Sequence, residues 1–300
     1  MKKYYGRRND LEIGEQFKHR IGRLYPPYIA LLIAAILLTL LKRVIPYDVL
    51  SHLLSIQNIH WMITGYHSPM QWMTAHTWTL SIEVINGLVW LILLKLCSKK
   101  SFCKAMVVAI ILAIAYRVVT ISYIGDVYIT SLCPIAHMDA FALGSLLAVS
   151  CNENTVKKAS LHGCALLGIS GIFISIIYLA GSNHLSLLDG YKLLSSSKNY
   201  LTNVLTGNIY LFISLLSVGI IGSLYVNSCK DKEKKDAFIK TILRKMGDDS
   251  YVLYLFHWPI LVVVKRVLTE NWLLTFPIVL LATSFATLLF KMVLRKWRFR

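Results

Sequence analysis

The chain has 300 residues, 56% of them hydrophobic, with a mean hydropathy of +0.59 and a formal net charge of +17. It is too apolar to be an ordinary soluble domain. Its six cysteines show no CxxC pairing and it has no glycine-rich phosphate loop, which argues against a disulfide framework, a zinc module and an ATP-driven machine.

Eight segments are apolar and long enough to cross a bilayer, since a membrane helix needs about 20 mostly apolar residues. They cover residues 27–45, 77–96, 105–123, 132–150, 161–180, 203–226, 250–268 and 272–294. We therefore predict an all-α, polytopic transmembrane helix bundle of about eight spans. Residues 1–26 form a basic cytoplasmic segment ahead of a transmembrane domain over 27–300. Residues 48–64 are less apolar and predict a re-entrant or interfacial piece.

The cations alternate between loops. Of the 32 Lys and Arg residues, 25 fall in alternate loops, within 1–26, 95–104, 157–158, 227–249 and the tail from Lys291. The other loops hold Lys42, Arg43, Arg117, Lys192, Lys198, Lys265 and Arg266. The positive-inside rule then places both termini in the cytoplasm. The net charge is thus a topology signal, and we expect no nucleic-acid partner.

The stretch "FKHRIGRLYPPYIA", residues 17–30, places Arg20 and Arg23 one turn apart on a helix face. The two guanidinium groups suit a fork that grips an anion such as phosphate. Membrane anchoring is the simpler alternative. Pro26 and Pro27 are expected to break and restart the helix.

Two acids lie within predicted spans, Glu83 and Asp139, where ionisable groups are functional candidates. Glu83 can pair with an arginine, act as a base or bond a substrate hydroxyl, and a structural ion pair is the alternative. Trp78 and Ser81 precede it, with Ser81 about 200° away around the helix. Asp139 follows His137 at the start of the fourth span, where helix capping or water binding is the alternative.

A stripe of polar and aromatic residues marks the seventh span. Ser250, Tyr254, His257 and Trp258 follow i, i+4, i+7, i+8 spacing and so share a helix face. An interfacial aromatic belt and a satisfied core histidine are the simpler interpretations. Pro259 predicts a kink.

The expected external segment, residues 51–76, combines aromatic and amide side chains that suit a sugar. They include Gln57, Asn58, Trp61 and Trp72. The spacing of its four histidines matches no compact metal-ligand pattern, so we expect no metal.

Four motifs in order, "RIGRLYPPY", "WTLSIEV", "HMDAFALGSLLA" and "SYVLYLFHWPI", resemble the signatures of the membrane acyltransferase-3 family. The resemblance covers nearly the whole chain. It implies a multi-pass protein of the bacterial inner membrane that uses cytoplasmic acyl-CoA, usually acetyl-CoA, as co-substrate and has no other cofactor. It also implies an acceptor hydroxyl on a cell-envelope glycan or lipid-linked sugar.

The resemblance places Arg20 and Arg23 on the acyl-CoA side and matches Glu83 and Asp139 to family acids. His137 stands where the family usually has an arginine. The family also opens with two further helices that carry its catalytic histidine. We expect this chain to lack them, so that a second polypeptide would have to supply them.

The candidate catalytic residues are Glu83, Asp139 and His257. The candidate substrate-binding residues are Arg20, Arg23, Trp78, Ser81, His137, Tyr254 and Trp258. Transfer of an acyl group to an envelope carbohydrate is the leading hypothesis, with membrane lipids as surroundings. The alternatives are an inactive truncated remnant, and a transporter or flippase of a glycan intermediate. A transporter predicts inverted repeats, which we do not find in the sequence.

Overall fold

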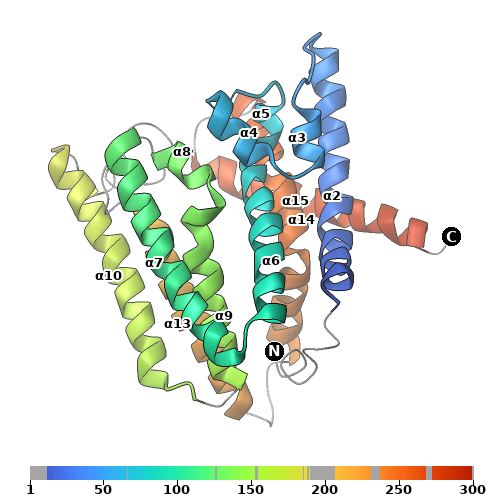
Figure 1. Ribbon diagram of the computed structural model, residues 1–300. Helices are drawn as coiled ribbons and strands as arrows, with labels where there is room; N and C mark the ends of the chain where they lie inside the picture. Colours follow the sequence, from blue (N-terminus) through green and yellow to red (C-terminus); the bar gives the residue numbers. More distant parts are fainter. Residues whose placement is uncertain are drawn as a thin grey trace. The chain divides into compact units, whose positions relative to one another are not determined.

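The computed structural model describes residues 12–65, 67–125, 127–152, 155–184, 186–187, 189, 207–230, 237–267 and 272–298. Every regular element in these ranges is helical, which confirms the all-α prediction (Figure 1). The chain divides into two compact units, which we describe separately. Unit 1 comprises residues 1–16 and 85–234, and unit 2 comprises residues 17–84 and 235–300.

Within the described ranges, eight helices are long and apolar enough to span a membrane, in agreement with the eight predicted spans. These spans are Ile13–Leu41, Gln71–Leu96, Lys99–Ile124, Pro134–Cys151, Lys158–Ser182, Ile209–Val226, Asp249–Val267 and Leu274–Val293. The segment predicted to be re-entrant forms the short helices α3 (Val49–Leu53) and α4 (Gln57–Thr64) and belongs to no span.

Unit 2 is built from α2 (Ile13–Leu41), the short helices that follow it, the start of α6 (Trp78–Leu96), α14 (Ala237–Val267) and α15 (Trp272–Arg298). The short helices are α3, α4, α5 (Gln71–Thr74) and the 3-10 turn η1 (Ala75–Thr77). The core brings together residues far apart in the chain, among them Tyr28, Leu32, Met70, Leu80 and Leu255. Apolar packing therefore holds the N-terminal and C-terminal parts of this unit together.

The expectation that Pro26 and Pro27 break the helix is wrong, because α2 continues through both. A proline removes the hydrogen bond to the carbonyl four residues earlier and crowds that carbonyl. Those carbonyls belong to Gly22 and Arg23, which are both exposed. They can therefore be solvated without breaking the helix.

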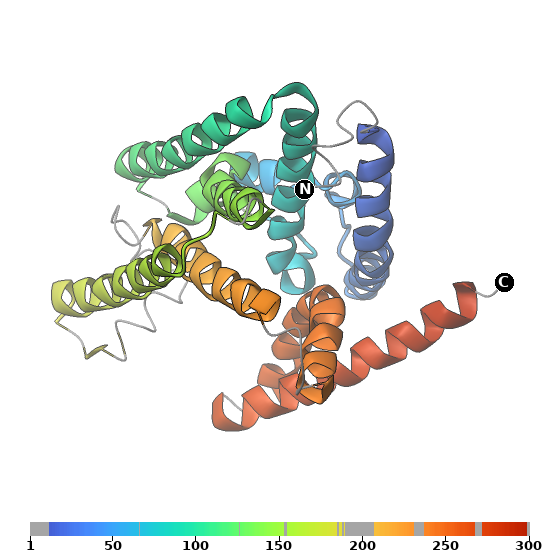
Figure 2. The same cartoon turned by 90° about the horizontal axis from the view of Figure 1, so that it is seen from below.

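Unit 1 contains α7 (Lys99–Ile124), α8 (Val127–Leu132), η2 (Pro134–His137), α9 (Met138–Asn152), α10 (Lys158–Ser182) and α13 (Ile209–Lys230). Helix α7 packs on α9, α9 on α13 and α13 on α10 (Figures 1 and 2). The α10–α13 approach is close: a Cβ added at Gly168 would lie 2.5 Å from the backbone nitrogen of Leu216. Glycine at this position lets the two backbones meet.

Candidate functional site

The ion pair between Arg20 and Glu83 in unit 2 leaves both side chains partly exposed. Arg20 Nη2 donates to Glu83 Oε1 at 3.1 Å, and the two side chains are 34% and 39% exposed. Ser81 and Leu80 are buried on other faces of α6. Helix α6 thus directs Leu80 and Ser81 into the core and holds Glu83 on a side of the helix that is partly open.

Two polar atoms near this pair are buried without a hydrogen-bond partner. They are Arg20 Nε and the hydroxyl of Tyr251 on α14. Glu83 is an electrostatic neighbour of Tyr251. Buried polar groups normally have partners, so unpaired donors beside a partly open ion pair are suited to receive a polar ligand.

A second cluster in unit 2 joins α14 to η1. The hydroxyl of Tyr254 donates to the His76 carbonyl at 2.5 Å and lies 2.5 Å from Thr79 Oγ1. The imidazole of His76 lies 3.1 Å, at Nε2, from the Leu255 carbonyl, and its ring centroid is 5.4 Å from that of His257. His257 in turn contacts the Tyr254 carbonyl through Nδ1. Tyr254 and His257, two residues of the polar stripe predicted on α14, therefore lie together beside His76.

The remaining substrate-binding candidates of unit 2 differ in their surroundings. Arg23 is exposed, whereas Ser81 is fully buried. Trp78 is partly buried at the start of α6, and Trp258 Nε1 is buried without a hydrogen-bond partner. Arg20 pairs with Glu83, and the anion fork expected from Arg20 and Arg23 stays a prediction.

In unit 1, Asp139 forms a buried ion pair with Arg117. Arg117 Nη2 donates to Asp139 Oδ2 at 2.6 Å, and the side chains are 1% and 0% exposed. The same guanidinium donates through Nε to Asn208 Oδ1 at 2.9 Å and through Nη1 to the Ala136 carbonyl. Asp139 Oδ1 accepts the amide of Ala140 at 2.9 Å. Every part of this buried charge pair is therefore compensated.

His137 is also buried in unit 1. Its Nε2 lies 2.8 Å from the Ser131 carbonyl, and its ring lies 4.7 Å, edge to face, from that of Tyr210. These contacts favour a packing role for His137. Its predicted substrate-binding role stays a prediction.

The model of the acyltransferase domain family Acyl_transf_3 matches residues 4–296. The chain belongs to the acyltransferase-3 family. A search of curated proteins and a search of solved structures give no match. Together with the eight spans, the family makes this acyltransferase a multi-pass membrane protein that carries out acyl transfer.

One residue of this acyltransferase lies elsewhere than the sequence predicts. Arg117 was expected among the external-loop cations, but it lies within α7 and is buried. The signal that identifies it is its place inside the apolar segment 105–123, where a charge requires a partner. Asn208 and Tyr251 carry no comparable signal, since neither residue is unusual near a membrane interface.

Helix rotation sets the surroundings of two further groups of candidate residues. The carboxylate of Glu83 is on the open side of α6. The groups expected to bind sugar in α4 point inward: Gln57, Asn58 and Trp61 have no exposed surface. Gln57 Nε2 donates to the Thr77 carbonyl at 2.9 Å, so this amide holds α4 against η1.

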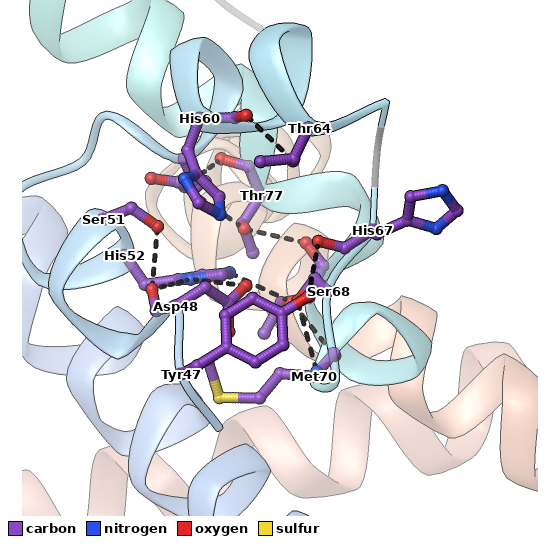
Figure 3. A network of polar contacts seen from close by, with 12 residues as sticks. Tyr47, Asp48, Ser51, His52, His60, Thr64, His67, Ser68, Met70 and Thr77 are labelled. Carbon is purple, nitrogen blue, oxygen red and sulfur yellow. Dashed lines mark hydrogen bonds and ion pairs between the residues drawn. The ribbon is translucent and has the colours of Figure 1, made fainter. Parts of the chain in front are cut away.

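A buried polar network fixes α3 (Figure 3). His52 Nδ1 lies 3.0 Å from the Asp48 carbonyl and 3.6 Å from Asp48 Oδ2, and Nε2 lies 3.2 Å from Thr74 Oγ1. Burial lowers the pKa of His52, and the neighbouring Asp48 opposes only part of that shift. The neutral imidazole therefore links α3 to α5, and the network has a structural role.

Proposed function

We propose that this acyltransferase transfers an acyl group from cytoplasmic acyl-CoA to a hydroxyl group of a cell-envelope carbohydrate, at the inner membrane of a bacterium. The observation that carries the proposal is the Arg20–Glu83 pair, in which both side chains are about one-third exposed. The family assignment supports acyl transfer in general. Acetyl-CoA is the donor that the family resemblance favours.

The pair provides the two groups that acyl transfer needs. One oxygen of Glu83 accepts from Arg20, and within the described ranges the carboxylate has no further hydrogen bond. The other oxygen can accept the proton of an acceptor hydroxyl as general base. Arg20 can donate to the oxygen of the thioester carbonyl, where negative charge develops during attack.

The hydroxyl oxygen bonds to the thioester carbonyl carbon while its proton moves to Glu83. The carbon–sulfur bond then breaks, and the thiol of CoA leaves with the proton that Glu83 returns. The unpaired hydroxyl of Tyr251 near Glu83 can donate a hydrogen bond to the bound acceptor.

Asp139 and His257 are not needed in this step. The carboxylate of Asp139 is buried in its pair with Arg117, and His257 contacts the Tyr254 carbonyl. Their predicted catalytic roles stay predictions. A base supplied by a second polypeptide would assist proton removal alongside Glu83. Arg20 would keep its role at the thioester carbonyl.

The proposal is tested with the full chain purified into proteoliposomes. Radiolabelled acetyl-CoA is added outside, with the lipid-linked oligosaccharide fraction of the host envelope as acceptor. We expect labelled ester in the glycan fraction and an equal amount of free CoA thiol. Protein that inserts correctly but releases no thiol would support the inactive remnant. Movement of the oligosaccharide across the bilayer without ester formation would support the transporter.

A further inference from the structure

Helices α14 and α15 of unit 2 enclose a groove of about 590 Å³. Its walls are mainly apolar and include Leu261 on α14 and Phe276, Val279 and Leu280 on α15. Phe276 and Leu280 are 68% and 54% exposed, so the groove opens outward. The mechanism proposed above uses no residue of this groove.

The dimensions of the groove fit a hydrocarbon chain. It follows α14 from Ser250 to Lys265, which at 1.5 Å per residue is ~22 Å. This is longer than the ~15 Å of hydrocarbon in one leaflet, so an alkyl chain that enters at the Lys265 end fills only the nearer part of the groove. The groove is open along one side, and an alkyl chain, whose carbons keep about 4 Å from their neighbours, can lie along it.

A cation stands at one end of the groove. Lys265 lies in the last turn of α14, two positions before the end of the span Asp249–Val267. A residue at the end of a span lies at the level of the lipid phosphates. Lys265 is exposed and has no ion-pair partner in the part of the chain that the structure describes.

We propose that this groove binds one acyl chain of an anionic phospholipid of the bilayer, with Lys265 paired to the phosphate. An apolar channel that ends in a cation at interface depth complements a molecule with an alkyl chain and an anionic head. The chain passes Leu261 and reaches His257, which lines the same groove. The bound lipid would thus cover the imidazole of His257 and separate the His76–Tyr254 cluster from the bulk bilayer.

Lys265→Gln tests the proposed ion pair between Lys265 and the lipid phosphate, and Arg266→Gln is the matched control. Arg266 is the next residue and is exposed, but it does not line the groove. Each protein is placed in nanodiscs of phosphatidylglycerol and phosphatidylcholine, and native mass spectrometry counts the retained lipid. We expect Lys265→Gln to retain phosphatidylglycerol about fivefold more weakly, as for loss of one interfacial cation. Arg266→Gln should match the wild type.

Leu280→Trp, which fills the groove, tests whether the acyl chain of the lipid binds there. Leu281→Trp is the control. Leu281 is 71% exposed and lies outside the groove. We expect at least a tenfold loss of retained phosphatidylglycerol in Leu280→Trp only. Equal losses in Lys265→Gln and Arg266→Gln, unchanged retention in Leu280→Trp, or equal retention of the two lipids would each overturn the proposal. Since the readout is lipid retention, it is independent of acyl transfer.

Discussion

Arg20 and Glu83 form an ion pair of 3.1 Å although 63 positions separate them in the sequence. The pair joins α2 to α6 within unit 2 and leaves both side chains partly accessible. In contrast, the Arg117–Asp139 pair of unit 1 is closed on every side. The carboxylate at 83 is therefore partly accessible, whereas the carboxylate at 139 is enclosed within unit 1.

Breaking the Arg117–Asp139 pair from one side should destabilise the protein strongly. Asp139→Leu leaves the Arg117 guanidinium buried without its counter-ion, and we expect a loss of about 3–5 kcal/mol in the free energy of unfolding. Arg117→Met combined with Asp139→Leu should recover most of that loss, because no uncompensated charge remains. Denaturant titration in detergent micelles measures both. A single variant within ~0.5 kcal/mol of wild type would show that the pair is dispensable.

Acid should destabilise unit 2 through His52. Burial holds the pKa of His52 below its ordinary value of about 6.5, so the unfolded chain binds more protons just below that pH. The contribution is complete above pH ~6.5 and is lost progressively as the pH falls below it. Thermal melts from pH 8 to pH 5 measure the slope. His52→Gln should flatten the slope, and His67→Gln, at an exposed position, should not.

Tyr254→Phe should weaken the link between α14 and η1. The substitution removes one of the two donors to the His76 carbonyl, since Thr79 Oγ1 also donates to it at 3.1 Å, and it removes the contact between Tyr254 and Thr79. Loss of a typical hydrogen bond costs about 0.5–1.5 kcal/mol. Tyr47→Phe is the matched control, because Tyr47 is exposed and its hydroxyl donates to the His67 carbonyl at 3.3 Å. We expect less than ~0.5 kcal/mol for the control. Equal melting temperatures for both variants would contradict the structural role of Tyr254.

The α10–α13 approach predicts opposite effects of two alanines on one helix. In Gly168→Ala the new Cβ would meet the Leu216 and Phe212 backbone at 2.5 and 2.6 Å, so the helices must separate, at about 1–3 kcal/mol. Gly163→Ala meets nothing within 4 Å and should be neutral or stabilising by up to ~1 kcal/mol. Melting temperatures in detergent compare the two. Gly168→Ala with the stability of Gly163→Ala would show that the contact does not form.

The eight spans were predictable because bilayer thickness imposes a length of apolar sequence that any window detects. The α14 stripe was predictable because helical spacing places residues 250, 254 and 258 on one face. Neither prediction requires the position of a partner helix.

Partners and helix rotation were not predictable, because they depend on contacts between distant segments. The sequence marks Glu83 as a charge within a span, but it does not indicate whether Arg20 or Arg23 meets it. A charge at Arg117 or at Asp139 is costly in an apolar span, which indicates that each needs a partner but does not show which one. The inward rotation of Gln57 and Asn58 has no such signal, because amides are as common at a membrane surface as in a buried network.

The most direct measurement is the single-turnover rate of acyl transfer by Glu83→Gln in proteoliposomes, relative to wild type. Glu15→Gln, at an exposed acid in the first turn of α2, is the control. If Glu83 is the general base, the variant should lose about 10²–10⁴-fold in transfer rate with nearly unchanged donor affinity, and the control should match wild type. A Glu83→Gln rate within a few-fold of wild type would contradict the assignment of the Arg20–Glu83 pair as the acyl-transfer site.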